Sequence, residues 1–307
     1  MRFLLLKIFV LLMSSLGVLR AEDRDIWPIT DFKIQGTGAT NVLIIPCMSC
    51  RWRAFDKFME RNQDHYTMYA ITIPGFGGSE IPELPMWSDQ PVWQENALTA
   101  VENFIDKHNI KDAIVVSHSW GSVLAVQLLA RRDDFAKSWI ILDTYVPFDK
   151  SEQTLPYSEK VKLAAKWRED FFHPLYSPDE WANFNKPSPY MPHDRQILYY
   201  GMFMATPREV VFQYWRENGL RNINTDFGKV NIPVLEVKSI SPIQPDPEDA
   251  KKRYRARYDT MPTPKLLRTV FIKNTGHYQV EQRPEIIDEI VRKVVSGDLV
   301  EDYDPPQ

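Results

Sequence analysis

The segment IVVSHSWGSVLA, residues 114–125, runs from β-branched residues into helix-forming residues through a short polar stretch. A strand that ends at Val116 would be followed by SHSWG and then by an apolar helix. A serine with small residues two positions away on each side is typical of a sharp strand-to-helix turn, because larger side chains would collide with neighbouring backbone. The pattern predicts a nucleophilic Ser119 at the apex of this turn. The side chain of the adjacent His118 points away from Ser119 on such a turn. The general base for Ser119 must therefore come from another part of the chain.

Strands and helices alternate along most of the 307-residue chain. Apolar strands are expected at residues 41–45, 67–73, 112–117, 138–143, 233–238 and 267–273, and helices near 52–62, 92–108, 121–132 and 284–297. Continuous apolar strands separated by helices favour a parallel sheet that is buried on both faces. The sequence therefore predicts an α/β fold with a mostly parallel central sheet and helices on both of its faces.

Residues 146–227 depart from this alternation. They contain no convincing strand and are rich in aromatic residues and helical patterns. The clearest helix is TPREVVFQYWRENG, with Thr206 expected as N-cap and Gly219 as the stop. A helical insertion at this point predicts a cap over the active site. The core domain would then comprise residues 22–145 and 228–307.

The first 21 residues form a separate unit. Arg2 and Lys7 precede an apolar run that is too short to span a bilayer, and Ala21 precedes an acidic segment. This predicts a signal peptide over residues 1–21, with an uncleaved anchor helix as the alternative. Cleavage removes three basic residues and no acidic one, so the net charge changes from −4 to −7. We expect an exported protein, periplasmic or secreted, with no nucleic-acid partner and no stable membrane insertion after cleavage.

Cys47 and Cys50 are the only cysteines and have C-x-x-C spacing. In an exported protein such a pair fits a small disulfide or a redox site. A redox site would require a thioredoxin-like unit of about a hundred residues around it, whereas the strand and helix alternation continues well beyond that length. The sequence favours a structural or idle pair and leaves open whether the two cysteines are bonded.

Four motifs, taken in order, resemble the α/β-hydrolase fold family. They are LIIPCMSCRW (43–52), TIPGFGGSE (72–80), SHSWGS (117–122) and NTGHYQVEQRPEII (274–287). They look like the oxyanion strand and loop of the family, its glycine-rich turn, its nucleophile elbow, and its terminal histidine loop with the last helix. The resemblance covers nearly all of the mature chain and implies the α/β-hydrolase fold with a serine nucleophile, although the fold does not fix the reaction.

The same resemblance implies that His277 is the general base, because it lies between the last expected strand and the final helix. The acid is less clear. The loop that usually carries it, residues 241–248 here, has no acidic residue before Asp246. Asp143, at the end of an earlier strand, occupies the other position that the fold uses. We favour Asp143 as the acid, and Asp246 and Glu248 remain as alternatives.

Two backbone N–H groups are expected to form the oxyanion hole. One belongs to Trp120, directly after the nucleophile, and the other to Met48 in the PCMSC loop. The side chains of Trp52 and Trp120 are expected to line an apolar substrate pocket. The sequence has no cluster of metal ligands and no dinucleotide-type glycine loop, so we expect neither a metal nor an organic cofactor.

These features predict an exported serine hydrolase that cleaves a carboxylic ester, or a related acyl bond, of a moderately apolar small molecule. Two alternatives remain. A cofactor-independent dioxygenase or C–C bond hydrolase of the same fold is one, since IILDTYVP and the proline-rich SISPIQPDPE loop look like that subgroup. A non-catalytic binding protein that keeps the fold is the other. The sequence identifies neither the substrate nor the oligomeric state.

Overall fold

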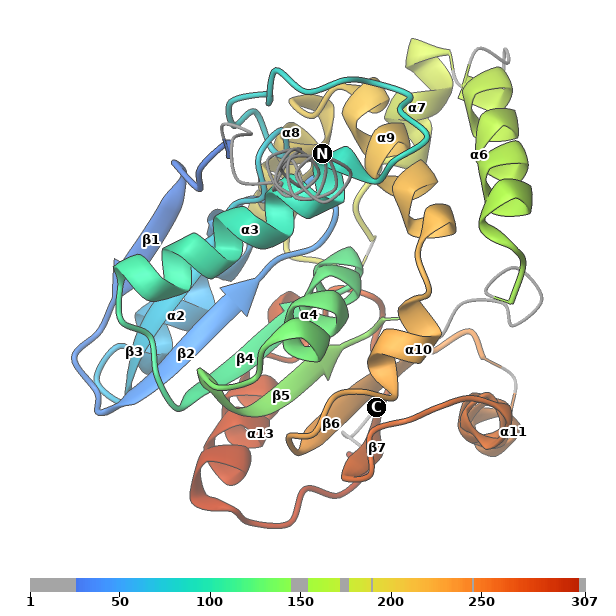
Figure 1. Ribbon diagram of the computed structural model, residues 1–307. Coiled ribbons are helices and arrows are strands. Elements are labelled where there is room, and N and C mark those ends of the chain that lie inside the picture. Colours follow the sequence, from blue (N-terminus) through green and yellow to red (C-terminus); the bar gives the residue numbers. More distant parts are fainter. Residues whose placement is uncertain (1–25, 145–153, 172–176, 189, 245, 304–307) are drawn as a thin grey trace, which may run out of the picture.

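The computed structural model describes residues 26–144, 154–171, 177–188, 190–244 and 246–303 (Figure 1). The predicted signal peptide lies outside these residues. A seven-stranded sheet has the order β1-β3-β2-β4-β5-β6-β7. Its strands are β1 (Phe32–Gln35), β2 (Thr40–Ile45), β3 (Tyr66–Ile71), β4 (Ala113–His118), β5 (Ala136–Leu142), β6 (Val234–Ile240) and β7 (Leu267–Lys273). Only β1 pairs antiparallel, with β3, and every other pairing in the sheet is parallel.

Helices cover both faces of this sheet. The helices are η2 (Trp52–Phe55), α2 (Asp56–Asn62), α3 (Val92–Lys107), α4 (Trp120–Arg131), α6 (Tyr157–Phe171), α7 (Pro178–Phe184), α8 (His193–Met204), α9 (Arg208–Leu220), α10 (Ile223–Phe227), α11 (Pro247–Ala256), η4 (Tyr258–Thr260), α12 (Gln279–Gln282) and α13 (Pro284–Ser296). Successive side chains of a strand point to opposite faces of the sheet. Val115 accordingly belongs to the apolar cluster with α3 and α4, and Val116 belongs to the cluster with α2 and α13 on the other face. The predicted fold class is confirmed.

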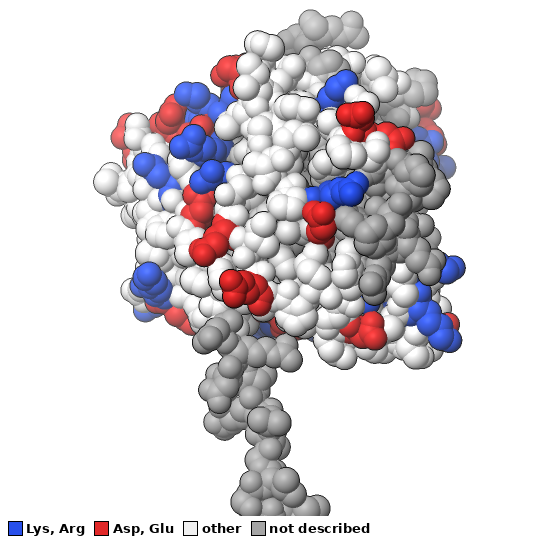
Figure 2. Space-filling model, turned by 90° about the horizontal axis from the view of Figure 1, so that it is seen from above, with Lys and Arg blue, Asp and Glu red and all other residues white. Residues whose placement is uncertain are grey.

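Helices α6 to α9 lie beyond the carboxyl ends of the central strands, and we call them the cap (Figure 1). Within the described part of residues 154–220 no strand occurs. The cap packs on the core through α3 and α9, whereas the next helix, α10, packs against α4 of the core. Seen from above in Figure 2, basic and acidic side chains are interspersed over the described part of this face. The first residues of the predicted cap, 146–153, lie outside the described ranges.

Arg195 of α8 ties the cap to the core. Its guanidinium lies 2.8 Å from the carboxylate of Asp56 and 2.6 Å from that of Glu281, and it donates to the carbonyl oxygen of Arg53 at 3.0 Å. The side chains of Arg195 and Glu281 are 7% and 5% exposed. Removing one member of such a buried pair leaves the other charge uncompensated, so this contact fixes the position of α8 over η2 and α12.

Thr206 does not cap α9 as predicted. The helix begins at Arg208 after Pro207, and no side chain caps its N-terminus. The Thr206 hydroxyl instead accepts the N–H of Gly77 at 2.7 Å and donates to the carbonyl of Met202. The predicted stop, Gly219, lies inside the helix. Thr206 is therefore a contact between the cap and the glycine-rich turn of the core.

Glu217 of α9 is fully buried against the first turn of α3. Its carboxylate accepts the N–H groups of Trp93 and Gln94 at 3.1 and 2.7 Å, and Gln213 donates to it at 2.6 Å. The Glu217 carboxylate thereby satisfies two N–H groups that the N-terminus of α3 otherwise leaves without a partner. Burial nevertheless raises the pKa of Glu217 to about 7. The folded state therefore binds the Glu217 proton more tightly than the unfolded chain does.

This raised pKa predicts a pH-dependent stability. The contribution of Glu217 is fully present below the unfolded pKa, near 4.5, and is lost as the pH rises through about 7. Between pH 4.5 and pH 8 the wild type should lose up to about 3 kcal/mol of unfolding free energy relative to Glu217→Gln, which cannot titrate. Urea denaturation of both proteins at the two pH values measures the difference. A difference that does not change with pH would contradict the assignment.

Candidate active site

Ser119 stands between β4 and α4 with φ 53° and ψ −127°. A positive φ is rare for a residue with a side chain and stores backbone strain, which is typical of functional sites. Its N–H donates to the carbonyl of Leu142 at 3.0 Å, which ties the turn to β5. A Cβ at Gly121 would lie 2.2 Å from the carbonyl oxygen of Pro46. Glycine is therefore required two residues after Ser119, as the small-residue pattern predicts.

His277 and Asp143 lie side by side although 134 residues separate them. The Nδ1 atom of His277 is 2.8 Å from Oδ2 of Asp143, and Oδ1 of Asp143 accepts the N–H of Ser239 at 3.0 Å. Burial acts to raise the pKa of Asp143, but the hydrogen bond and charge of His277, together with Lys238, outweigh it and hold this pKa below its usual value. The carboxylate is thus ionised at neutral pH and engaged on both oxygens.

The alternative acids lie elsewhere in the structure. Asp246 is the N-cap of α11 and accepts the N–H of Asp249 at 3.0 Å. Glu248 lies 3.2 Å from the ammonium of Lys251 and is 72% exposed. Of the three acids considered from the sequence, the contact with His277 is made by Asp143.

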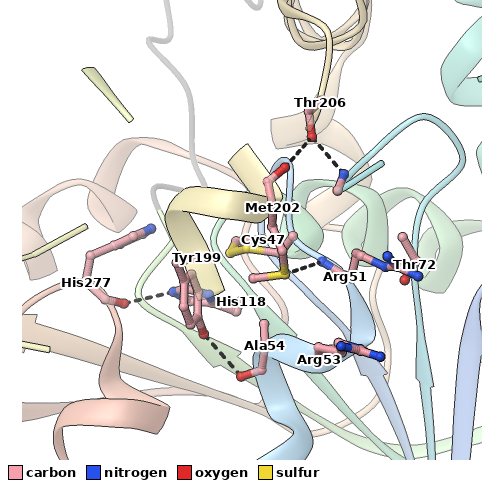
Figure 3. Close-up of a disulfide and its surroundings, with 12 residues drawn as sticks. Cys47, Arg51, Arg53, Ala54, Thr72, His118, Tyr199, Met202, Thr206 and His277 are labelled. Atoms are coloured by element: carbon pink, nitrogen blue, oxygen red, sulfur yellow. Dashed lines mark hydrogen bonds between the residues drawn. A yellow bond between two sulfur atoms is a disulfide. The ribbon is translucent and has the colours of Figure 1, made fainter. Parts of the chain in front are cut away.

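His118 connects the nucleophile turn to the histidine loop. Its Nε2 lies 2.8 Å from the carbonyl oxygen of His277, and the two rings are 4.7 Å apart (Figure 3). Because a carbonyl only accepts, Nε2 of His118 carries the proton. Burial, and next the charge of His277, lower the pKa of His118 to about 3, so it stays neutral. His118 therefore holds the loop without placing a charge beside His277.

Further contacts hold the histidine loop in place. The Ser239 hydroxyl donates to the carbonyl of Gly276 at 2.6 Å, and the side chain of Gln282 accepts the Gly276 N–H at 2.6 Å. Sequence reasoning missed His118, Ser239 and Gln282. His118 and Gln282 lie inside the motifs and Ser239 lies at the end of β6, but each one binds a backbone group of the histidine loop, which leaves no local pattern in the sequence.

A disulfide joins Cys47 and Cys50, whose Cα atoms are 5.1 Å apart (Figure 3). This answers the question that the sequence left open. The Cys50 N–H donates to the carbonyl of Cys47 at 3.0 Å, and both cysteines are buried. The closed turn contains Met48 and Ser49, and Ser49 has a φ of 61°. The disulfide therefore constrains the segment that carries the Met48 N–H.

The backbone N–H groups of Met48 and Trp120 belong to two segments that reach the same cavity. Trp120 is the first residue of α4, where a helix N–H has no partner within the helix and the helix dipole favours negative charge. Met48 follows the end of β2 by three residues. The two predicted donors thus follow the carboxyl ends of neighbouring strands β2 and β4 and belong to the same cavity wall as Ser119.

The cavity has a volume of about 390 Å³ and lies between core and cap. Its core wall includes Met48, Ser119, Trp120, Asp143 and His277. Its cap wall includes Trp181, Phe203, Val211 and Trp215. The side chains that were predicted from the sequence to react with one another thus share one largely apolar cavity.

Trp52, which was predicted to line the pocket, is not part of the cavity wall. Its indole Nε1 donates to the carboxylate of Asp31 at 3.1 Å, and its backbone N–H donates to the hydroxyl of Thr72 at 3.0 Å. The indole bond turns the Trp52 side chain toward the segment before β1, and the backbone bond ties it to the segment after β3. The prediction for Trp52 was wrong, whereas Trp120 does line the cavity.

Residues 42–289 match the sequence profile of the Alpha/beta hydrolase family. The chain belongs to this family. A segment of 65 residues is 42% identical to "Putative esterase/lipase 1" of Mycoplasma genitalium and covers 21% of this chain and 22% of that protein. The chain spans about a quarter or less of the length of the curated relatives it matches.

Several solved structures share the fold of this chain. One is a hydrolase from Oleispira antarctica, with a TM-score of 0.66 and 14% identity over 89% of this chain and 97% of that chain. Another is E-2-(acetamidomethylene)succinate hydrolase, with a TM-score of 0.58 and 18% identity over 86% of this chain and 94% of that chain. At these identities the likeness extends to the fold alone.

The described residues contain no cluster of three or more His, Cys, Asp or Glu side chains that could hold a metal ion. Nor does any described helix combine the length and apolar character needed to cross a membrane.

The disulfide offers a test of what the turn does. The double variant Cys47→Ser, Cys50→Ser should lower the unfolding free energy by about 2 kcal/mol, as expected for a short closed loop. Turnover should stay within about tenfold, since one backbone donor is displaced but no reacting group is removed. Thermal denaturation and steady-state kinetics measure both effects. Complete loss of turnover in a folded variant would instead indicate that the cysteines take part in the chemistry.

Proposed function

We propose that this protein is an exported serine hydrolase that cleaves a carboxylic ester of a small, moderately apolar molecule. One observation carries the proposal: the Asp143–His277 pair lines the same cavity as Ser119 on its strained turn. A histidine bound through Nδ1 to an ionised carboxylate has its Nε2 available as a general base.

In the proposed mechanism, Nε2 of His277 removes the proton of the Ser119 hydroxyl as its oxygen attacks the ester carbonyl. The tetrahedral intermediate carries its negative charge on the former carbonyl oxygen, which accepts the N–H groups of Met48 and Trp120. His277 then donates its proton to the leaving alcohol, and an acyl group remains on Ser119. Water attacks this acyl group by the same steps and releases the carboxylic acid.

The cavity supports a small substrate. Its volume of about 390 Å³ lies near the lower end of the 300–1,000 Å³ that is usual for small-molecule sites. Apolar side chains from core and cap make up most of the wall, which suits a substrate with an apolar portion. Among the curated relatives, the name of the Mycoplasma genitalium protein refers to an esterase or lipase.

Export is the second part of the proposal. A predicted signal peptide and a disulfide support it independently, because disulfides persist mainly in oxidising compartments. Detection of a mature chain that begins at Glu22, outside the cytoplasm of an expressing cell, would test this part. Retention of the first 21 residues would contradict it.

A cofactor-independent dioxygenase or C–C bond hydrolase remains the second candidate. It is favoured by the position of the acid, since Asp143 follows β5 rather than β6. Hydrolysis of 4-nitrophenyl butyrate by the purified protein, measured beside oxygen consumption with a hydroxylated aromatic substrate, separates the ester hydrolase from the dioxygenase. Ester turnover without oxygen consumption supports the hydrolase, and the reverse result overturns it. A non-catalytic binding protein would do neither.

A further inference from the structure

The cavity wall contains a buried amide with an unused donor. Asn218 of α9 is 4% exposed, and its Oδ1 accepts from the side-chain amide of Gln94. That amide nitrogen also donates to the carbonyl of Tyr214 at 3.2 Å, which fixes the orientation of both amides. The Nδ2 of Asn218 consequently has no hydrogen-bond partner within the described part of the chain. Asn218 lines the cavity, so a bound molecule could supply the missing acceptor.

A second unused donor belongs to Trp120, a residue of the core wall of the cavity. The indole Nε1 of Trp120 is buried and has no hydrogen-bond partner among the described residues. Indole N–H groups only donate. A buried donor without an acceptor costs about 1–3 kcal/mol, and native structures usually contain an acceptor for such groups. Two residues of the cavity wall therefore carry a buried donor for which a bound molecule could bring an acceptor atom.

The charged residues of the cavity wall also favour a ligand with acceptor atoms. Lys186, which follows α7, lines the cavity, and none of the ion pairs among the described residues includes it. Asp143 is the one acidic residue of the described cavity wall, and both of its oxygens are already engaged by His277 and Ser239. Lys186 is thus an exposed cation at the edge of a mostly apolar wall, with no carboxylate partner among the described residues.

We propose that the cavity selects an ester that carries a second, anionic group, namely a carboxylate. Lys186 binds this carboxylate, while Asn218 and Trp120 donate to acceptor atoms of the bound molecule. The apolar wall contacts the carbon chain between the two groups. A half ester of a small dicarboxylic acid has this chemistry. The inference rests on the proposed ester hydrolysis and adds the substrate class to it.

Two matched substrate pairs test the inference. In the first pair, mono-4-nitrophenyl glutarate carries the charge on the acyl side, and its methyl ester is the neutral partner. In the second pair, 4-acetoxybenzoate carries the charge on the alcohol side, and its methyl ester is again neutral. We expect the wild type to prefer the anionic member of at least one pair by about tenfold in kcat/KM, the effect of one charge-assisted hydrogen bond.

Lys186→Met keeps most of the side-chain length and removes the charge, so it should reduce the preference to within about twofold. Lys186→Glu should reverse the preference. The matched control is Lys162→Met, because Lys162 lies on cap helix α6 with its side chain 72% exposed and outside the cavity wall. This control should behave as the wild type does. Equal kcat/KM values within both pairs, unchanged in Lys186→Met, would overturn the inference and leave ester hydrolysis standing.

A binding measurement separates this inference from the proposed function. Calorimetry with glutarate should show binding to the wild type and binding at least about fivefold weaker to Lys186→Met. If no ester is cleaved but this difference is present, the proposed function fails and the anion site stands. If glutarate binds both proteins equally or neither, the anion site is wrong.

Discussion

Ser119→Ala is expected to lower kcat/KM for 4-nitrophenyl butyrate by about 10⁴-fold or more, since it removes the oxygen that carries the acyl group in the proposed mechanism. The fold should survive, because alanine is smaller than serine and the Ser119 side chain does not cap α4. Steady-state kinetics give the loss, and thermal denaturation shows whether the variant is folded. Activity near the wild-type value would exclude Ser119 as the nucleophile.

Ser122→Ala is the matched control for this variant. Ser122 lies one turn further along α4 and is fully buried. Its hydroxyl oxygen is 2.8 Å from that of Ser117 and accepts from the Thr144 hydroxyl at 2.9 Å. The substitution should lower stability by about 1 kcal/mol, the net value of a buried hydrogen bond. Turnover should change little, because this hydroxyl is not adjacent to the reacting groups.

Asp143→Asn is expected to lower turnover by up to about 10⁴-fold. The contacts of Asp143 explain why. The Ser239 N–H donates to one oxygen, so asparagine would keep its carbonyl oxygen there and present its NH₂ group to His277. A donor opposite Nδ1 stabilises the tautomer with the proton on Nε2, and this tautomer cannot accept the Ser119 proton. The pH dependence of kcat, measured beside its value, reports the change at the base.

Asp246→Asn is the control for the acid. Asparagine caps helices about as well as aspartate does, so α11 should remain stable. Turnover should stay within about twofold of the wild type, since the Asp246 carboxylate accepts the N–H of Asp249 rather than contacting His277. A large loss in Asp246→Asn together with full activity in Asp143→Asn would show that the wrong acid is assigned.

Periodicity predicted the interior of the sheet well. Strand β7 has the predicted bounds, and β2, β4, β5 and β6 differ from the prediction by a few residues at most. Each of these pairs in parallel with its neighbours and contains a buried apolar stretch. Strand β1, residues 32–35, was not predicted. It is a four-residue edge strand with half-exposed or exposed side chains, and the alternation of apolar and polar residues in FKIQ is too short to stand out in the sequence.

Predictions from local sequence were wrong at positions whose role is set by contacts with distant residues. Thr206 and Gly219 have the composition of helix ends, but the Thr206 hydroxyl binds the N–H of Gly77, 129 residues away. Trp52 has the apolar character of a pocket residue, yet two hydrogen bonds turn it toward Asp31 and Thr72. Neither partner can be identified from the neighbouring sequence.

The motifs located the candidate nucleophile and base, because a sharp turn and a terminal loop leave local patterns. The choice among three acids needed the structure, since Asp143 meets His277 only after β5 and β6 pair in the sheet. His118 was missed for the same reason. Its partner is a backbone carbonyl 159 residues away, which has no signature in sequence.

The most direct test of the account is covalent labelling with a fluorophosphonate, followed by mass spectrometry of the peptides. Such probes modify a serine that a neighbouring histidine activates. We predict one adduct per chain, on Ser119, with labelling abolished by Ser119→Ala and slowed strongly by Asp143→Asn. An adduct on a different serine, or an unlabelled Ser119 in folded protein that hydrolyses esters, would contradict the account.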